Sequence, residues 1–413
     1  MRALSPGPAF CYSRNFVAST PITVMAVRLP VTVLSGFTGA GKTTVLHHLV
    51  AQAGARVAVV DSQGDLLAEV ERLAQAGQHD HAVTEAAATD EPLGIAEGFV
   101  FEDEHGEAAR VAHLDTLVTV VDASRFLQDY HDADFLSARG IAAHDDDDRT
   151  VVDVLIDQIE VCDVIVVNKI DLVDARQLGR LHVILRALNP RADIVDASHG
   201  QVPAERVLGT GRFDIDATPN AAGWQAALQG DAVPDAAGVS TLVYRRRRPF
   251  HPQRFADLIH TEWMREHGDV LRSKGLFWLA SRMDIAGDWS QAGGVCRPGA
   301  AGAWWAAIDA TEWPAEGLAR AAIEADLVDD GLPAEYGDRR QELVLIGMDL
   351  DAHALEAQLD ACLLTDDEMA AGPDAWAAYP DPFPDWGNAF DDDHDHDHEH
   401  DHGDGPCDCG HAH

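Results

Sequence analysis

Basic residues are scarce in this sequence. Its 413 residues include 30 lysines and arginines against 70 aspartates and glutamates, which gives a formal net charge of -40 at pH 7. Such a charge repels the phosphates of nucleic acids and the head groups of anionic membranes, and we therefore expect neither as a partner. The same charge favours cations, metal ions included.

Cysteines and long apolar runs are scarce as well. The six cysteines are scattered except for Cys407 and Cys409, so they form no disulfide framework and indicate a reducing compartment, which we expect to be the cytoplasm. No apolar run has the length of a membrane-spanning helix.

Residues 1–30 read as an N-terminal extension without the continuous apolar core of a secretory signal. Its residues 1–24 either belong to a transit peptide or, as we prefer, are a stretch upstream of a true start at Met25.

The sequence does contain a complete phosphate-binding loop, or P-loop. Residues 36–44 read G-F-T-G-A-G-K-T-T, between the apolar run 31–34 and the helix-like stretch 45–50. In this spacing the glycines let backbone N–H groups surround phosphate oxygens, the lysine reaches the terminal phosphates and the first threonine hydroxyl binds Mg²⁺. The pattern predicts a nucleotide site formed by Gly36, Gly39, Ala40, Gly41, Lys42, Thr43 and Thr44.

Strands and helices alternate after this loop. Short apolar runs cover 56–61, 81–85, 117–122, 164–167 and 193–197, and helical periodicity covers 65–73, 151–160 and 174–188. The alternation predicts an α/β domain over 31–212 with a doubly wound parallel sheet, whose ligands lie at the carboxyl ends of the strands. Asp61, Glu85 and Asp122 end three of these strands. Their carboxylates are therefore candidates to position Mg²⁺ or a water molecule beside the loop.

Residues 79–81 read H-D-H and resemble a small metal site at first sight. They lie at the amino end of a predicted strand, however, whereas phosphates bind at the carboxyl ends. We therefore expect this group on the surface and far from the nucleotide.

The fifth predicted strand is followed by the sequence N-K-I-D at 168–171. A carboxylate at Asp171 can accept hydrogen bonds from the N1–H and the 2-amino group of guanine, whereas adenine lacks both donors. Asn168 and Lys169 would brace the loop and cover the base. At a strand end downstream of a P-loop, the tetrapeptide predicts that the nucleotide is GTP.

A change of composition marks a second domain. Residues 213–238 are rich in Ala, Gly, Asp and Pro and read as an interdomain linker. Predicted strands at 239–244, 276–280 and 342–347, with helices at 255–266 and 352–363, indicate a smaller α+β domain over 239–388. The four consecutive arginines at 245–248 either dock nucleotide or an acidic partner or, as we favour, form a solvated edge that balances nearby acids.

The last stretch, 389–413, alternates imidazoles with carboxylates. It cannot bury a core, so we expect it to be disordered without a ligand. Imidazoles and thiolates bind zinc, nickel, copper and cobalt, and we interpret the stretch as a metal-capturing tail and not merely a solvating one. The predicted ligands are His394, His396, His398, His400, His402, Cys407, Cys409, His411 and His413.

The P-loop, the N-K-I-D sequence and the tail together resemble the CobW-type GTPases, which are metallochaperones linked to zinc and cobalt handling. The sequences V-V-D-A at 120–123, R-T-V-V-D at 149–153 and G-D-R-R-Q-E-L-V at 337–344 are also similar to this family. The resemblance extends from 31 to about 386. It implies a protein that binds GTP or GDP with Mg²⁺, carries Zn²⁺ or a related divalent metal, and serves a metalloprotein client.

Two features depart from the family pattern. Members carry a switch segment with a C-x-C-C metal motif after the second strand, whereas residues 61–64 lead directly into the next helix here. The family's E-[ST]-[ST]-G-x-S-E-P reads E-A-A-A-T-D-E-P at 85–92, so Ala88 replaces the glycine whose N–H would meet a γ-phosphate. These departures weaken the case for hydrolysis more than the case for nucleotide binding.

Two functions are consistent with the sequence. In the first, a metal-handling GTPase, Lys42 and Thr43 hold the phosphate charge, Glu85 or Asp122 positions water, and Thr43 with Asp61 binds Mg²⁺. In the second, a non-catalytic metal buffer, the nucleotide domain is a degenerate switch. The sequence names neither the metal nor the client, and it leaves the oligomeric state open.

Overall fold

The structure is a computed structural model of the chain. It describes residues 28–61, 64–100, 108–132, 134–142, 144, 147–215, 217–218, 222–230, 238–261, 263–315, 317–329 and 332–386. Most of the extension 1–30 and the whole of the tail 389–413, with its predicted metal ligands, lie outside these residues. Among the helices that the structure describes, none combines the length and apolar character that crossing a bilayer requires.

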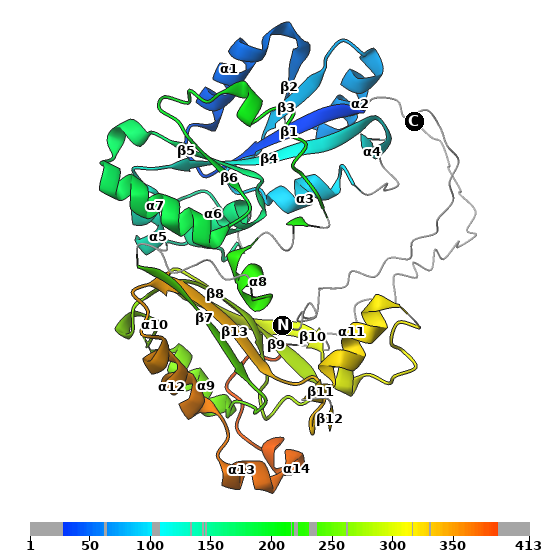
Figure 1. The fold of residues 1–413 in the computed structure, drawn as a ribbon, viewed down its shortest axis with the longest axis vertical. Helices are drawn as coiled ribbons and strands as arrows, with labels where there is room; N and C mark the ends of the chain where they lie inside the picture. The colour runs from blue at the N-terminus through cyan, green and yellow to red at the C-terminus, as the bar shows by residue number, and fades with distance from the viewer. Residues whose placement is uncertain are drawn as a thin grey trace, which may run out of the picture.

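The N-terminal part of the chain forms a six-stranded sheet with helices on both faces (Figure 1). The strand order is β2-β3-β1-β4-β5-β6 and every pair is parallel, which confirms the predicted doubly wound sheet. The strands are β1 (Leu29–Ser35), β2 (Val57–Asp61), β3 (His81–Glu85), β4 (Ala112–Asp122), β5 (Val164–Asn168) and β6 (Asp193–Asp196). The helices are α1 (Lys42–Ala53), α2 (Leu66–Ala76), α3 (Pro92–Glu97), α4 (Ala108–Val111), α5 (Phe126–Asp132), α6 (Val151–Val161), α7 (Ala175–Leu188) and α8 (Gly223–Leu228).

Local sequence explains where the longer helices begin. Helix α6 starts at a capping box in which Thr150 accepts from the backbone N–H of Asp153 and the Asp153 carboxylate accepts in return from the N–H of Thr150. Helix α7 starts in the same way with Asp174 and Gln177. Strand β5, which lies between β4 and β6, is buried along its whole length because helices cover both of its faces. These elements fix the edge of the sheet on which the carboxyl ends lie.

The C-terminal part forms a five-stranded sheet in the order β10-β9-β8-β13-β7, in which all pairs are antiparallel. Its strands are β7 (Val239–Arg246), β8 (Asp269–Phe277), β9 (Ile285–Ala292), β10 (Val295–Ala303) and β13 (Gln341–Met348), and a separate pair is β11 (Val328–Asp329) with β12 (Leu332–Pro333). Its helices are α9 (Pro252–Ile259), α10 (Trp263–Glu266), α11 (Leu318–Asp326), α12 (Ala352–Cys362), α13 (Asp366–Ala371) and α14 (Pro373–Trp376). This part is the α+β unit that the sequence predicts.

Strand β13 joins the two parts of the molecule because both of its faces are buried. Leu343 and Leu345 belong to the core under α9 and α12, whereas Val344 and Ile346 belong to the core of the first sheet. This alternation follows from the period of two of a β-strand.

Helix α8, within the segment 213–238 that composition marks as a linker, lies between the two sheets (Figure 1). A Cβ on Gly223 would lie 1.7 Å from the carbonyl oxygen of Ala187, so only glycine allows α8 to approach α7 this closely.

Two local predictions in the second domain are wrong, and one hairpin was missed. The helix expected over 255–266 is divided, because the side chains of His260 and Thr261 bond backward to the carbonyls of Ala256 and Leu258 and end α9. The strand expected at 276–280 begins earlier, at Asp269. The hairpin of β9 and β10 was not predicted at all, because its glycines and alanines lack the β-branched pattern of a strand.

The expectation of a surface position is wrong for one histidine of the H-D-H sequence. His81 is 7% exposed, and its Nε2 lies 2.9 Å from the hydroxyl of Thr32. Burial lowers the pKa of His81, with the nearby Asp115 acting in the opposite direction. The group does lie at the amino end of β3, at the opposite edge of the sheet from the P-loop.

The four arginines at 245–248 bind mostly within their own domain, although Arg245 also donates to the carbonyl oxygen of Leu228 in α8. Arg245 pairs with Glu342, Arg246 with Asp360 and Arg248 with Asp366. Arg247 donates to the carbonyl oxygen of Gly337 at 2.8 Å. The run therefore balances local acids and holds the end of β7 in place, in agreement with the interpretation that we favoured.

A buried ion pair joins the two parts of the molecule. Arg272 of β8 donates to both carboxylate oxygens of Glu160 on α6, at 2.9 and 3.2 Å, and the two side chains are 6% and 10% exposed. On the same side, the Tyr130 hydroxyl donates to the carbonyl oxygen of Leu271. A buried charge is tolerated only while its partner is present.

Removing one partner of this pair is expected to destabilise the protein strongly. Arg272→Met leaves Glu160 charged and buried, and we expect the free energy of unfolding to fall by about 3–5 kcal/mol. The double variant Arg272→Met/Glu160→Leu removes both charges and should recover most of that loss. Urea unfolding of the three proteins measures both effects. A single variant as stable as the wild type would contradict the prediction.

Candidate nucleotide-binding site

The P-loop connects β1 to α1 and depends on glycine at two close approaches. Gly36 has φ of 137°, and a Cβ there would lie 2.4 Å from the carbonyl oxygen of Val120. Gly41 has φ of 101°, and a Cβ there would lie 2.4 Å from Nδ2 of Asn168. Any larger residue would therefore push the loop away from β4 and β5. The backbone that would surround phosphates is thus fixed by contacts with the neighbouring strands.

Lys42 begins helix α1 with its side chain folded over the loop. Its Nζ donates to the carbonyl oxygen of Gly36 at 2.7 Å, and the residue is 8% exposed. Burial lowers the pKa of Lys42, while the negative charges of Glu85 and Asp90 act to raise it. A partly desolvated cation at the amino end of a helix is a strong anion site.

Thr43 contacts one carboxylate at the end of a strand, and a second carboxylate ends the neighbouring strand. Its hydroxyl donates to Oε1 of Glu85, at the end of β3, at 2.9 Å. Asp61 ends β2 in register with Glu85. A hydroxyl and two carboxylates are the hard oxygen ligands that Mg²⁺ prefers. The chemistry of these predicted residues therefore fits a Mg²⁺ ion next to the phosphates.

Asp122 has a different environment from Glu85, because β4 and β3 lie on opposite sides of β1. Lys169 donates to Asp122 Oδ2 at 2.6 Å and to the carbonyl oxygen of Gly39 at 2.6 Å. Burial acts to raise the pKa of Asp122, but hydrogen bonds from Lys169 and Ser124 outweigh it and hold that pKa below its usual range. Through these contacts Asp122 braces Lys169 against the P-loop, and its catalytic role stays a prediction from the sequence.

Asn168 ties the predicted base-reading sequence to the P-loop. Its side-chain amide donates to the carbonyl oxygen of Ala40 at 2.9 Å and accepts from the N–H of Gly200 at 3.0 Å. The Ser198 hydroxyl donates to Oδ1 of Asp171 at 2.6 Å. This bond is the main reason that the pKa of Asp171 is lowered, which keeps the carboxylate ionised.

Ser198 and Gly200 are site residues that the sequence analysis missed. They follow β6 in the sequence S-H-G at 198–200, and His199 between them has φ of 52°. Their position directly after a predicted strand could have indicated a role in the site, because every parallel strand of the sheet ends at the edge that carries the P-loop. The three residues lack a spacing that would have distinguished them from an ordinary turn.

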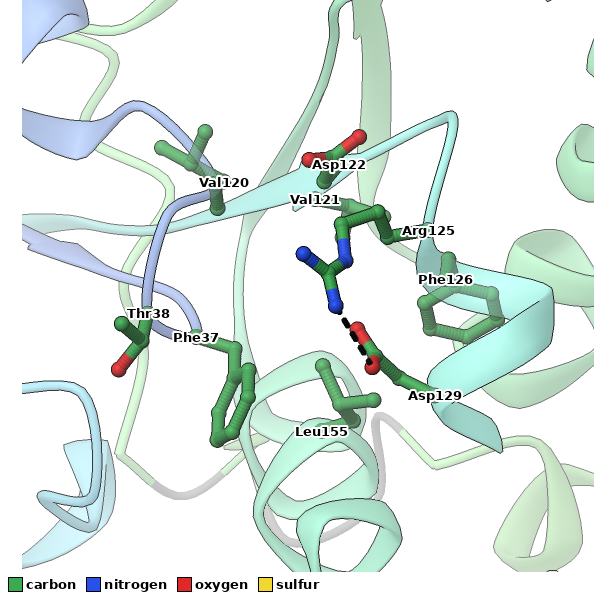
Figure 2. A pocket seen from close by; sticks show the side chains of 10 residues that line it. Phe37, Thr38, Val120, Val121, Asp122, Arg125, Phe126, Asp129 and Leu155 are labelled. Atoms are coloured by element: carbon green, nitrogen blue, oxygen red, sulfur yellow. Dashed lines mark ion pairs between the residues drawn. The ribbon is translucent and has the colours of Figure 1, made fainter. Parts of the chain in front are cut away.

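Figure 2 shows a pocket beside the P-loop. Phe37 and Thr38 of the loop line one side, and Arg125 and Asp129 line the other. The Arg125 guanidinium extends into this pocket, and its nearest approach to the Asp129 carboxylate is 3.9 Å. The sequence analysis gave no role to Arg125, which here lies next to the loop that would hold the phosphates.

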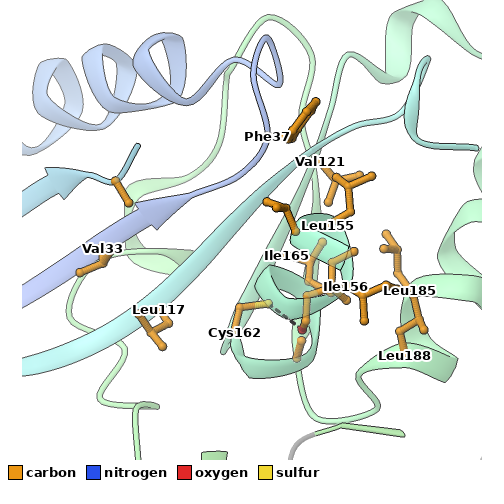
Figure 3. Close-up of a cluster of buried hydrophobic side chains, with 14 of the residues drawn as sticks. Val33, Phe37, Leu117, Val121, Leu155, Ile156, Cys162, Ile165, Leu185 and Leu188 are labelled. Carbon is orange, nitrogen blue, oxygen red and sulfur yellow. Dashed lines mark hydrogen bonds between the residues drawn. The ribbon is translucent and has the colours of Figure 1, made fainter. Parts of the chain in front are cut away.

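A packed apolar cluster supports the site from below (Figure 3). Phe37 of the P-loop packs into it together with Val121 of β4 and Leu155 of α6. Cys162 also lies in this cluster, and burial raises the pKa of its thiol to about 12. Within the residues that the structure describes, no group of three or more His, Cys, Asp or Glu side chains is placed to hold a metal ion.

Comparison with known proteins identifies both parts of the chain. Residues 30–63 and 61–196 match the family model described as CobW/HypB/UreG, nucleotide-binding domain. Residues 239–363 match the model described as the cobalamin synthesis protein cobW C-terminal domain. The two segments of the first match meet at 61–63, where the sequence analysis places the missing switch segment.

Several known proteins are similar to this chain. The zinc-regulated GTPase metalloprotein activator 1 of Dictyostelium discoideum is 33% identical over 405 residues, which cover 86% of this chain and 84% of that protein. A zinc chaperone of Mycobacterium tuberculosis is 33% identical over 289 residues, 68% of this chain and 64% of the relative. The crystal structure of the Zn(II)-bound YjiA GTPase from E. coli is 17% identical with a TM-score of 0.37, covering 82% of this chain and 100% of that one.

The matches extend over both domains, and the first of these relatives is aligned over most of its own length. They agree with the P-loop, the N-K-I-D sequence and the C-terminal motifs on which the resemblance was based. The chain therefore belongs to the CobW/HypB/UreG family of nucleotide-binding proteins and carries a CobW C-terminal domain.

Proposed function

We propose that this chain is a GTPase that handles a divalent metal, with zinc as the metal that its named relatives support. The observation that carries the proposal is the set of hydrogen bonds around the P-loop. Thr43 bonds to Glu85 on one side of the loop, and Ala40 bonds to Asn168 on the other. The groups suited to phosphate, Mg²⁺ and guanine are thereby gathered around one rigid turn.

Phosphate binding would use the main chain and one side chain of the loop. The N–H groups of the P-loop surround the phosphates, and Lys42 exchanges its bond with Gly36 for one with the terminal phosphates. Thr43, Asp61 and Glu85 would hold Mg²⁺, either directly or through water. When bound, the ion supplies positive charge next to the phosphates. Glu85 would also accept a hydrogen bond from water near the terminal phosphate and so orient it.

Guanine recognition would use the loops after β5 and β6. Asp171 would accept the two donors of guanine, and the bond from Ser198 orients its carboxylate for this purpose. The stem of Lys169 would cover the base while its amine stays bound to Gly39 and Asp122. The base site and the phosphate site are connected by Asn168, so that neither moves without the other.

Metal binding would use the tail at 389–413. That tail lies outside the described residues, and the described ones offer no cluster of ligands. Our second candidate, a metal buffer in which nucleotide turnover has been lost, would use the same tail. The two candidates differ in whether GTP is hydrolysed. In either case we propose a metalloprotein client as the partner and a cytoplasmic location.

The first prediction concerns the base. GTP and GDP should bind at least about 100-fold more tightly than ATP, because Asp171 would be left unpaired by adenine. Asp171→Asn should shift the preference towards xanthine nucleotides, since an amide donor matches the 2-oxo group. Competition binding with the four nucleotides measures the preference. Asp196→Asn is a suitable control, because Asp196 ends β6 nearby but pairs with His182. Equal affinity of the wild type for ATP and GTP would contradict the assignment.

The second prediction concerns turnover. Because Ala88 stands where the family has glycine, we expect slow hydrolysis, and Lys42→Ala should abolish it by removing the charge at the terminal phosphates. Phosphate release from GTP, measured with and without Zn²⁺, tests both points. Lys274→Ala is the matched control, since Lys274 pairs with Asp288 in the C-terminal domain. Turnover that survives Lys42→Ala belongs to a contaminant, and a wild type that binds GTP without turnover supports the buffer.

The third prediction concerns the tail. A chain truncated after Phe390 should retain GTP binding and lose most of its Zn²⁺ stoichiometry. Imidazole binds metal only when neutral and has an ordinary pKa near 6.5, so Zn²⁺ binding by the full chain should weaken as the pH falls from about 7.5 to 5.5. Calorimetry on both chains decides the matter. Tight binding of one Zn²⁺ by the truncated chain would mean that the folded domains contain a metal site.

A further inference from the structure

Helix α6 lies between the loop that follows β3 and the C-terminal domain. The loop, residues 86–91, directly follows Glu85, which binds Thr43. It is therefore the segment through which the sheet reaches the terminal phosphate of a bound GTP. Its own hydrogen bonds are few: the N–H of Ala87 donates to Asp90 Oδ2 at 2.8 Å, and the N–H of Asp90 donates back to the carbonyl oxygen of Ala87 at 3.3 Å. Such a loop depends on its neighbours for a fixed position.

Two side chains of the α6 region hold this loop by its carbonyl groups. Gln158, which is completely buried, donates through Nε2 to the carbonyl oxygen of Ala88 at 3.0 Å. Arg149, just before α6, donates through Nη1 to the carbonyl oxygen of Thr89 at 3.2 Å and to Oε1 of Glu91 at 3.3 Å. The loop also lies near the P-loop lysine, because the charge of Asp90 acts on Lys42.

Arg149 is itself held rigidly. Its Nε and Nη2 donate to the two carboxylate oxygens of Asp147 at 2.9 and 3.0 Å, and the Asp147 side chain is 2% exposed. This planar, bidentate pair fixes the guanidinium and leaves Nη1 directed at the loop. A lysine at this position could not make both sets of bonds.

A second arginine reaches the same region from the C-terminal domain. Arg297 of β10 donates through Nη1 to Asp148 Oδ2 at 2.8 Å and through Nη2 to Asp153 Oδ2 at 2.9 Å. Asp148 is the residue next to Arg149, and Asp153 forms the capping box with Thr150, the first residue after Arg149. The C-terminal domain therefore binds Asp148 and Asp153, which lie before and after the arginine that holds the loop.

We propose that Arg149 is a positioning residue for GTP hydrolysis, and that Arg297 fixes it from the C-terminal domain. Loop 86–91 then meets the terminal phosphate correctly only while the two domains are in contact. The inference rests on the proposed function, because it assigns a role within GTP binding and turnover. It extends that function by making the C-terminal domain a part of the catalytic arrangement.

The effect should be specific for the γ-phosphate. Lys42, Thr43 and Asp171 act on parts of the nucleotide that GDP also possesses. Loop 86–91 acts only on the phosphate that GDP lacks. Loss of the support for the loop should therefore reduce turnover and the affinity for a GTP analogue, and should leave the affinity for GDP unchanged. A general loss of folding would reduce all three together.

The test compares four variants of the full chain: Arg149→Gln, Arg297→Gln, the double variant, and Arg320→Gln as control. Arg320 is 31% exposed, much like Arg297 at 32%, and pairs with Glu324 within its own helix. For each protein, kcat for GTP, the Kd values for GDP and GTPγS, and the thermal unfolding midpoint are measured. The carboxylates that Arg297→Gln leaves behind, Asp148 and Asp153, are both in contact with solvent, so this replacement should not unfold the chain.

We expect Arg149→Gln to lower kcat by about 10- to 100-fold, as displacement of a positioning group does. Arg297→Gln should lower kcat by about 3- to 10-fold, in the range of energetic coupling between sites. Both should weaken GTPγS relative to GDP, with GDP affinity within about twofold of wild type. The double variant should resemble Arg149→Gln alone, because both changes act on one element. Arg320→Gln should behave as wild type.

Four results would overturn the proposal. For Arg149→Gln, these are an unchanged kcat with an unchanged ratio of GTPγS to GDP affinity, or a loss of GDP affinity parallel to that of GTPγS. The other two are an Arg297→Gln protein that behaves like the control and fully additive effects in the double variant. A wild type that binds GTP without hydrolysing it removes the catalytic role of Arg149 but not nucleotide binding. A wild type that binds no guanine nucleotide would instead overturn the proposed function, and this inference with it.

Discussion

The close approach of the P-loop to strands β4 and β5 is the constraint on which the site depends. Gly36 touches the main chain of Val120, and Gly41 touches the amide of Asn168, with no space for a side chain at either point. Because Asn168 also accepts from Gly200, the loops after β1, β5 and β6 move as one unit. The phosphate site and the base site are therefore held at a fixed separation without any ligand, which reduces the entropy that a nucleotide must lose on binding.

The sequence predicts those parts of the site whose residues are consecutive in the chain. The P-loop and N-K-I-D carry their chemistry within nine and four consecutive residues, so spacing alone identifies them. Ser198 and Arg149 act through pairing across 27 and 60 positions, which no local pattern records. The same distinction holds for the fold. The parallel strands are apolar runs, whereas the β9–β10 hairpin is built from small residues that are held by their neighbours. His81 was misplaced because burial next to Thr32 depends on tertiary packing.

Because basic residues are scarce in this chain, the arginines at the boundary between the domains are important for how the domains are placed. With 30 basic against 70 acidic residues, the acidic side chains outnumber the basic ones by more than two to one. Arg272 and Arg297 nevertheless both bind α6, at Glu160 and Asp153, on a helix whose acids would otherwise repel the acidic partner domain. Exposed pairs contribute little to stability, but a buried, bidentate pair specifies one arrangement of its elements, since any other leaves a charge desolvated. The relative placement of the domains is thus encoded by a few charges and by the two buried faces of β13.

The short connection between β2 and α2 makes that placement matter for chemistry. Only residues 62–65 separate the end of β2 from Leu66, so this side offers no long segment to cover a terminal phosphate. Coverage must then come from the other strand next to the site, β3, and from the loop 86–91 that follows it. That loop has Ala88 in place of a flexible glycine and takes its position from Gln158 and Arg149. In the arrangement that we propose, the position of this loop therefore depends on α6 and, through Arg297, on the C-terminal domain.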